Sequence, residues 1–476
     1  MGDDAKHMGE DPLTPHARPQ TEQEKRAIFN SKRVHSSVHR QDPNGMYHYD
    51  VGYLPASTPG RVGLDPEAIR KREKTHNILV AIALIVAVVA FLIGAYVFVG
   101  PSLFSLSWGS EGDSQTTSGD SSGAAASTAS TATQVDVCMV GDVLLHPSVY
   151  TSGEQEDGTY DFTNLFANVS DQVSAADIAM CDQETVLGGT ELGLSGYPAF
   201  NGPQEVGDAE AAAGFNVILH ASNHTLDMGY EGLHSELEFW RTKHPDVTVL
   251  GCIDVLSDDP GSLDDIYVYE KDGLKVAILN YTYGLGDYSD TEGAVAMLDE
   301  DRVRQDCERA NQLADIVIVC PHWGTEGMSE PDDEQTQWAQ VFLECGVDVV
   351  LGNHPHMLQP VEVLEDDNGN QMVCFWSVGN FISGMANEEN MVGGLAEVRL
   401  ERSEDGTCRV SGYGLKPIVS HIDPDNETTY FLSDYTDELA ETSKFPDYTP
   451  DQIQAYCEEV LGDAYDSEKC ELWVDL

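Results

Sequence analysis

An uncharged apolar segment at residues 78–100 constrains the topology of this chain more than any other feature. Its 23 residues, ILVAIALIVAVVAFLIGAYVFVG, lack any charge. As a helix it would be roughly 35 Å long, enough to cross a hydrocarbon core of about 30 Å. It is too long and too far from the N-terminus for a typical signal peptide. A buried core helix is the alternative, but a core helix of this length is rarely apolar on every side. We predict one transmembrane helix.

The flanks of this segment predict its orientation. Arg70, Lys71, Arg72 and Lys74 precede it, so the positive-inside rule places residues 1–77 in the cytoplasm and the remainder outside the cell. Residues 1–77 are rich in Pro, Gly, His and charge without a hydrophobic period, which predicts disorder. Residues 101–133 are mostly Ser, Thr, Gly and Ala and predict a flexible linker.

The charge of the chain is distributed unevenly. Residues 1–77 hold 12 of the 25 basic and 11 of the 82 acidic residues, which leaves a net charge of −58 on the rest. Such an excess argues against nucleic acid as a partner and against docking on anionic lipid head groups. An anionic ligand would need a local positive centre, which a bound metal ion supplies.

The ten cysteines do not follow a zinc-binding pattern, because no CxxC spacing occurs. Cys138, Cys181, Cys320 and Cys374 fall within apolar runs and are expected to be buried thiols. The other six could pair in an oxidising compartment, and the sequence leaves their connectivity open. These six are Cys252, Cys307, Cys345, Cys408, Cys457 and Cys470.

From residue 134 onward, short apolar runs alternate with segments of helical periodicity. Strands are expected at 135–140, 178–181, 215–219, 247–250, 316–320, 347–350 and 373–376, and helices at 165–173, 206–213, 229–240, 301–313 and 334–345. Asp272-Gly273 and Asp405-Gly406 indicate hairpins. The pattern favours an α/β fold of two stacked mixed sheets flanked by helices. We place this domain at 134–430 and expect an acidic C-terminal tail at 431–476 with one short helix at 450–461.

Polar side chains follow several of the expected strands, where α/β sheets bind ligands. His354 and His356 open the turn after one strand, and alternate residues share a face, so both rings can reach one metal site. Each residue alone has an ordinary structural explanation, such as a turn, a helix cap or a core histidine. Together, carboxylates, an amide and imidazoles form the mixed set of ligands that suits Mn, Fe or Zn. The set comprises Asp142, Glu184, Asn223, His224, His322, His354 and His356.

The order of these motifs resembles the calcineurin-like metallophosphatases and, more closely, the CapA family of bacterial poly-γ-glutamate capsule-synthesis proteins. The matching motifs are GDVLLH (141–146), DQE (182–184), ASNHTLDMGYEGL (221–233), PHWGTE (321–326), GNHPHMLQPVE (352–362) and SVGNFI (377–382). The likeness covers about residues 134–420. It implies a metallophosphatase-like layered sandwich.

The resemblance also implies roles for individual residues. Glu184 would bridge two divalent metal ions, with Asp142 and His356 on the first ion, and His224, oriented by Asp227, would lie over the site as an acid or anion stabiliser. The second ion would be held by Asn223, His322 and His354.

Four further residues are candidates for the metal site or its pocket. His146 departs from the Asp-x-His spacing of the phosphatases, which leaves its role as a ligand open. Trp323 and Glu326 are expected to shape the pocket. Asn380, together with Ser377, is expected to fix neighbouring groups or a turn.

Three hypotheses for function follow. The first is a membrane-anchored extracellular protein in the synthesis or export of an anionic surface polymer, with capsule synthase or export membrane proteins as partners. The second is an extracellular metal-dependent phosphoesterase, and the third is a non-catalytic assembly scaffold. The sequence leaves open whether the chain is a hydrolase, which metal it uses and what its substrate is.

Overall fold

The computed structural model describes residues 37–41, 47–50, 132–423 and 427–476. The chain divides into two compact units, residues 1–122 and 123–476. In the first, strands β1 (Ser37–Gln41) and β2 (Tyr47–Asp50) pair antiparallel, a hairpin that the expectation of disorder over 1–77 did not include. The predicted transmembrane segment at 78–100 and nearly all of the predicted linker lie outside the described residues. Among the helices that are described, none combines the length and apolar character needed to cross a bilayer.

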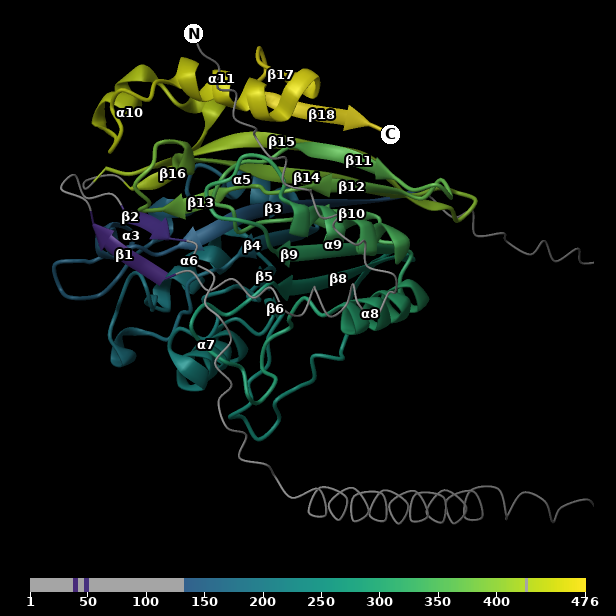
Figure 1. Ribbon diagram of the computed structural model, residues 1–476, viewed down its shortest axis with the longest axis horizontal. Helices are drawn as coiled ribbons and strands as arrows, with labels where there is room; N and C mark the ends of the chain where they lie inside the picture. The colour runs from purple at the N-terminus through teal and green to yellow at the C-terminus, as the bar shows by residue number, and fades with distance from the viewer. Residues whose placement is uncertain (1–36, 42–46, 51–131, 424–426) are drawn as a thin grey trace, which may run out of the picture. The chain divides into compact units, whose positions relative to one another are not determined.

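The larger sheet of the second unit is mixed. Its main path runs β17-β18-β15-β14-β3-β4-β5-β6, with β13 paired to β3 and β16 paired to β15 (Figure 1). The segment from β3 to β6 is parallel, whereas β14 is antiparallel to β3 and to β15. The strands are β3 (Thr133–Leu144), β4 (Ile178–Asp182), β5 (Val217–Leu219), β6 (Thr248–Leu250), β13 (Asn380–Ser383), β14 (Val392–Arg402), β15 (Cys408–His421), β16 (Thr428–Phe431), β17 (Tyr465–Asp466) and β18 (Glu471–Asp475).

The smaller sheet has the order β11-β12-β10-β9-β8-β7. Its four central strands are parallel, and antiparallel strands close both edges. The strands are β7 (Tyr267–Lys271), β8 (Leu274–Thr282), β9 (Ile316–His322), β10 (Val349–Leu351), β11 (Val361–Glu365) and β12 (Gln371–Phe375). The expected α/β class with two mixed sheets is confirmed.

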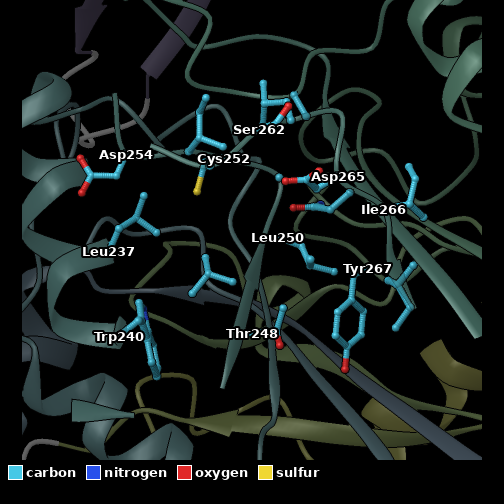
Figure 2. Close-up of a pocket in the computed structure, with 18 of the residues that line it drawn as sticks. Leu237, Trp240, Thr248, Leu250, Cys252, Asp254, Ser262, Asp265, Ile266 and Tyr267 are labelled. Carbon is cyan, nitrogen blue, oxygen red and sulfur yellow. The ribbon is translucent and has the colours of Figure 1, made fainter. Parts of the chain in front are cut away.

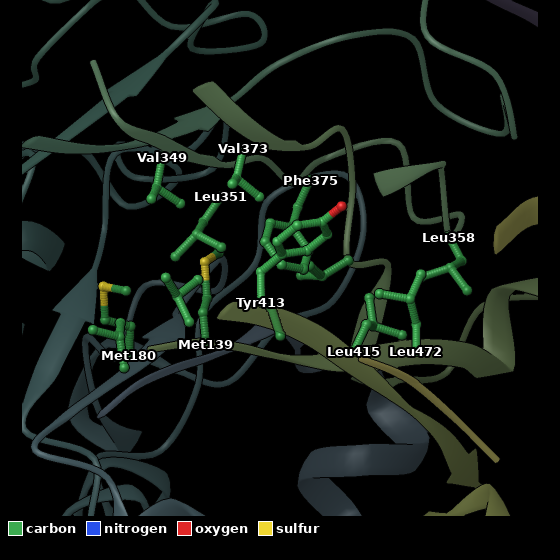
Figure 3. Packing of buried hydrophobic residues seen from close by; sticks show 14 of the residues in the cluster. Met139, Met180, Val349, Leu351, Leu358, Val373, Phe375, Tyr413, Leu415 and Leu472 are labelled. Carbon is green, nitrogen blue, oxygen red and sulfur yellow. The ribbon is translucent and has the colours of Figure 1, made fainter. Parts of the chain in front are cut away.

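Alternating side chains show how the sheets stack. On β3, Val137 and Met139 belong to one core cluster, whereas Cys138 and Val140 belong to another on the opposite face. The first cluster also contains Val349, Leu351 and Val373 of the smaller sheet, so it forms the core between the two sheets (Figure 3).

Helices cover the outer faces of both sheets. Helices α6 and α7 pack on the larger sheet, and α8 and α9 pack on the smaller one (Figure 1). Helix α4 also packs on the larger sheet. The side chain of Asp332 caps α9 in a capping box with Gln335, which determines where that helix begins. The helices are α3 (Pro147–Ser152), α4 (Thr163–Phe166), α5 (Ser170–Ala175), α6 (Glu205–Ala213), α7 (Gly229–Lys243), α8 (Glu300–Leu313), α9 (Asp333–Glu344), α10 (Asp437–Thr442) and α11 (Pro450–Leu461).

The segment 431–476 is part of the fold and does not extend as a tail. Strand β18 pairs antiparallel with β15 and enlarges the sheet. Helix α11 buries Ile453, Cys457 and Leu461 in the cluster that also fills the space between the sheets. These three residues follow one another at intervals of four, as expected for one face of a helix, and the helix predicted at 450–461 is confirmed.

Strand β3 is longer than expected, and this places the first candidate ligand. Asp142 lies within the strand, where it pairs in register with Asn380 of β13. A Cβ atom on Gly141 would lie 1.7 Å from the carbonyl oxygen of Gly379, so only glycine permits this approach of the two strands.

Candidate metal centre

Three buried carboxylates lie where the parallel strands of the larger sheet end. Asp142 lies in β3, Asp182 ends β4, and Glu184 follows two residues later. Both oxygens of Glu184 and one oxygen each of Asp142 and Asp182 are buried without a hydrogen-bond partner. Unpaired buried carboxylate oxygens are costly unless a cation compensates them.

Three histidines come from the smaller sheet. His322 ends β9, and His354 and His356 lie in the turn after β10. Both residues of the turn adopt left-handed backbone conformations, with φ of 102° at His354 and 57° at His356. Such strain in non-glycine residues is common where function determines the position of a side chain.

One group of contacts surrounds His356. Its Nδ1 lies 2.9 Å from Asp142 Oδ2, 3.1 Å from Asn380 Oδ1 and 3.9 Å from Glu184 Oε2. Asn380 also donates to the carbonyl of Asn390 at 3.0 Å, which fixes its amide. Asp142, Glu184 and His356 each offer an atom to one metal-sized cluster.

A second group surrounds His322. Its Nε2 lies 2.8 Å from Asn223 Oδ1, 3.1 Å from His354 Nδ1 and 3.6 Å from Glu184 Oε1. One ring nitrogen carries at most one proton, so it cannot donate to all three neighbours. Two nitrogens and two oxygens that converge in this way fit a divalent transition metal. Glu184 takes part in both groups, one oxygen in each.

Asp182 is a further carboxylate of the site and is not among the ligands predicted from the sequence. Its Oδ2 lies 3.2 Å from His322 Nδ1 and accepts from the Asn353 amide at 3.3 Å. A carboxylate on the far nitrogen of a ligand histidine orients the ring and raises its basicity. Its position at the end of an apolar run was a usable signal, but the resemblance directed attention to Glu184 in the same motif.

The ionisable groups of the cluster perturb one another strongly. Burial raises the pKa of Asp142 to about 7, and the neighbouring Glu184 adds to the shift. Burial disfavours the charged ring of His356, but Glu184 and Asp142 outweigh it and raise that pKa to about 10. Burial and the neighbouring His322 hold the pKa of His354 well below its ordinary value. The carboxylates therefore require positive charge, which a metal ion can supply in place of protons.

His224 lies beside Glu184, and its side chain is partly exposed. Its Nδ1 contacts Asp227 Oδ2 at 2.6 Å, and its Nε2 lies 3.9 Å from Glu184 Oε1. Burial opposes protonation of the ring, but the hydrogen bond to Asp227 and the charge of Glu184 raise its pKa. The edge of Phe200 meets the ring at 4.8 Å between centroids. A ring held in this way can donate a proton to a bound group.

The remaining candidates lie around or away from this cluster. His146 Nδ1 accepts from the Gly384 amide at 3.3 Å, and burial lowers the pKa of this ring to about 4. Glu326 is exposed, but its carboxylate comes within reach of His354 and His356. Trp323 is a core residue, not a pocket residue, since it is fully buried and donates to the Trp376 carbonyl at 2.9 Å.

Ser377 and Tyr283 also lie near the metal cluster. Ser377 accepts from the Gly379 amide at 3.2 Å and therefore fixes the turn that meets Gly141. The ring of Tyr283 packs against His354 with centroids 4.5 Å apart, a contact without any signal in the sequence.

A separate cavity of about 580 Å³ lies between α7, β6 and the start of β7 (Figure 2). It is lined by Leu237, Trp240 and Leu250 among others, and none of its described lining residues belongs to the metal cluster. One of its carboxylates, Asp254, contacts His234 at 2.9 Å and Arg241 at 3.6 Å. The metal cluster therefore lies apart from this cavity.

The residues at the strand ends fit a metal ion, because they combine unpaired buried carboxylate oxygens with converging imidazole nitrogens. The expectation of a metal site is supported to that extent. Asp142, Glu184, Asn223, His322, His354 and His356 all meet in the cluster, as the resemblance implied. Their roles as ligands stay a prediction.

Comparison with known proteins agrees with this site. The chain is similar to the PGA biosynthesis protein CapA of Bacillus subtilis (strain 168), with 30% identity over 202 residues, 41% of this chain and 50% of that protein. It is 27% identical over 236 residues to the capsule biosynthesis protein CapA of Bacillus anthracis, covering 46% and 54% of the two chains. The chain thus spans about half the length of these curated relatives.

Solved structures show a weaker likeness. A phosphatase from Mycoplasma pneumoniae has 15% identity and a TM-score of 0.36, over 60% of this chain and 94% of that one. A putative 5'-nucleotidase from Staphylococcus aureus, solved with alpha-ketoglutarate, has 16% identity and a TM-score of 0.40, over 60% and 54%. These scores are too low to support an inference about activity.

The model of the family described as "Bacterial capsule synthesis protein PGA_cap" matches residues 136–385, more than half of the chain and all six metal-site candidates. The chain therefore belongs to the PGA_cap family of bacterial capsule synthesis proteins.

Proposed function

We propose that this protein acts in the synthesis or export of an anionic surface polymer of the poly-γ-glutamate type through a centre of two divalent transition-metal ions. One observation carries the proposal: four buried carboxylate oxygens without partners, at the ends of strands of the larger sheet, lie among imidazoles from the smaller sheet. Membership of the capsule synthesis family supports the class of polymer. The ions would be Mn, Fe or Zn, which favour such mixed ligands.

The two groups of contacts suggest how the chain would hold the ions. Asp142 and His356 would hold one ion, Asn223, His322 and His354 the other, and Glu184 would reach both. Such ions supply Lewis acidity and lower the pKa of water. The chain contributes the orientation of the ligands through Asp182 and Asn380.

The surroundings of the centre favour an oxyanion as the group bound. A net charge of −58 outside residues 1–77 repels polyanions from the surface at large. A positive metal centre would therefore bind a single carboxylate or phosphate group, such as the group at the end of a polymer chain or at a linkage within the polymer. His224, oriented by Asp227, would donate a proton to the group that leaves.

The proposed location is the outer face of the cell membrane. The apolar segment at 78–100 would be the single-pass anchor, and the basic residues before it would keep the N-terminus in the cytoplasm. An anchored domain can associate with synthase or export proteins in the same membrane.

A second candidate is an extracellular metal-dependent phosphoesterase. The His224–Asp227 pair beside Glu184 favours it, because such a pair serves a leaving group in hydrolysis. Turnover of a broad phosphoester panel by the metal-loaded protein would favour this activity, and its absence would exclude it.

Metal content of the full-length chain tests the proposal. We expect near two equivalents of a transition metal in the parent protein, lost in Glu184→Ala and kept in Glu330→Ala, a control at an exposed position. In cells, Glu184→Ala should abolish the polymer. Little metal in the parent protein, or normal polymer with Glu184→Ala, would contradict the catalytic proposal and leave an assembly scaffold.

A further inference from the structure

Two cysteines on neighbouring helices lie in contact on the outer side of the smaller sheet. Cys307 lies in α8 and is fully buried, whereas Cys345 follows the last residue of α9 and is partly exposed. The side chains of the two residues hydrogen-bond to each other. One thiol of the pair is therefore open to reagents and the other is held directly behind it.

One side chain holds the backbone at the two cysteines together. The side-chain nitrogen Nδ2 of Asn311 donates to the carbonyl of Cys307 at 2.8 Å and to the carbonyl of Cys345 at 3.0 Å. A single nitrogen can reach both only if the two carbonyl oxygens are within about 6 Å of each other. The end of α9 is therefore held beside α8 at this pair.

Cys307 and Arg304 together make Cys345 the more reactive partner. Its guanidinium Nη1 lies 3.6 Å from Cys345 Sγ, while Nη2 and Nε bind Glu344 and Glu300 at 3.0 Å each and keep the group in place. The hydrogen bond from Cys307, followed by the charge of Arg304, lowers the pKa of the Cys345 thiol to about 7 against the opposing effect of burial. The thiolate is the form that attacks disulfides.

We propose that Cys307 and Cys345 form a redox pair, in which Cys345 attacks a small-molecule disulfide and Cys307 then closes an intramolecular disulfide. In the first step the Cys345 thiolate bonds to one sulfur of the reagent, the sulfur–sulfur bond of the reagent breaks, and one thiolate leaves. In the second step Cys307 attacks Cys345 Sγ, the bond from Cys345 to the reagent sulfur breaks, and the second thiolate leaves with the proton of Cys307. Two protein thiols are oxidised and one disulfide is reduced to two thiols.

The bond would connect the two helices that cover one face of the smaller sheet. Helix α8 leads into β9, which ends at His322, and α9 leads into β10, after which His354 and His356 follow. Oxidation would therefore stabilise the sheet that supplies these histidines to the metal cluster. An extracellular location, proposed above on separate grounds, would favour the oxidised form.

Peptide mapping of the full-length chain tests the pair. The protein, purified in detergent and equilibrated with oxidised glutathione, should yield a peptide that links Cys307 to Cys345. Cys345→Ser should lose this link, and Cys470→Ser should keep it. Cys470 is a matched control, since it is also partly exposed near a buried cysteine, but its sulfur donates to the Ser467 carbonyl at 3.7 Å.

Two further measurements separate a redox pair from a structural contact. Oxidation should raise Tm by about 5 °C in the parent protein and not in Cys345→Ser. At pH 7, Cys345 should react with iodoacetamide about tenfold faster than Cys470, and Cys307→Ala should reduce that advantage. Free thiols after equilibration, or glutathione held on Cys345 without the link to Cys307, would overturn the proposal. Metal content does not enter either measurement, so failure here would leave the proposed function untouched.

Discussion

His224 differs from the other histidines of the centre in its access to solvent. Its side chain is 12% exposed, compared with 1% for His322 and 4% for His356. A group bound between the carboxylates would therefore meet His224 first. Because Asp227 contacts its Nδ1, the proton available for transfer is on Nε2, which faces Glu184.

Replacing His224 should impair turnover without loss of metal. We expect His224→Ala to lower kcat on a responsive phosphoester by about 100-fold. Asp227→Asn should lower kcat by less, because the imidazole of His224 is still present and only the carboxylate that orients it is lost. Metal content measured on the same samples should stay at the parent value. His234→Ala serves as control, because that ring is 40% exposed and contacts Asp254 beside the separate cavity. Unchanged kcat in His224→Ala would exclude a role in proton transfer.

The buried carboxyl of Asp348 should make the stability of the protein depend on pH. Burial raises its pKa from 3.8 to about 6, although the carboxylate accepts from the Val317 amide at 2.8 Å and so connects β10 to β9. A raised carboxyl pKa means that the folded state holds the proton more tightly. The stability that protonation contributes is present at low pH and is lost as the pH rises through about 6.

Asp348→Asn should therefore stabilise the protein more at high pH than at low pH. The amide keeps an acceptor for Val317 and carries no charge. We expect a gain of about 2 kcal/mol in the free energy of unfolding at pH 8 and about half of that at pH 5. Denaturant titrations at both values measure it, with the exposed Asp367→Asn as control. An equal effect at the two values would show that Asp348 is ionised throughout.

At the scale of elements, the close contact between β3 and the turn before β13 positions the metal cluster. The amide of Asp142 donates to the Gly379 carbonyl at 3.2 Å, and the missing side chain of Gly141 makes that contact possible. Asp142 and Asn380 then lie side by side, both within reach of His356.

Gly141→Ala should break this arrangement. The added Cβ would lie 1.7 Å from a backbone oxygen that cannot move without separating the strands. We expect a loss of about 3 kcal/mol or more in unfolding free energy, together with weaker metal binding. The control is Gly284→Ala, where a Cβ meets nothing within 4 Å. A parent-like Tm in Gly141→Ala would show that the two strands separate at little cost.

Local patterns predicted most of the elements that build the centre, and long-range pairing accounts for what they missed. The alternation of apolar runs located β4, β5, β9 and β10, because a buried parallel strand is apolar along its whole length. Strand β13 has four residues and pairs with β3, more than two hundred residues away, so no local period reveals it. Asp142 was expected after a strand and lies within one for the same reason.

Individual residues also differ in whether the local sequence or the surrounding fold determines their position. The His-x-His motif predicted two rings at one site, but its left-handed backbone depends on the surrounding fold. The resemblance implies a place in the pocket for Trp323. The turn instead directs its ring into the core beside Trp376, with centroids 5.8 Å apart. Neighbours in sequence point in different directions once a strand ends, and composition alone does not tell which side is buried.

For the whole molecule, charge opposes compactness. Outside residues 1–77 the net charge is −58, and three of the carboxylates that contribute to it are buried together at the centre. The surface and the centre should respond differently to cations. Monovalent salt screens exposed charges over roughly 10 Å at 0.1 M, but it compensates a buried carboxylate poorly. A divalent ion that binds the centre adds stability according to its affinity.

Thermal unfolding of the metal-free chain separates these two effects. Raising NaCl from 20 to 500 mM should increase Tm by about 5 °C in every variant, because repulsion at the surface is screened. MnCl2 at matched ionic strength should give the parent protein a further gain of about 3 kcal/mol in unfolding free energy when its concentration reaches a hundred times Kd. Glu184→Gln should keep the response to NaCl and lose the additional gain, since the carboxylate shared by both groups is replaced by a neutral amide with a single oxygen. Glu404→Gln, at an exposed position, should keep both responses. If the manganese effect survives in Glu184→Gln, the ion acts on the acidic surface and not at the buried centre.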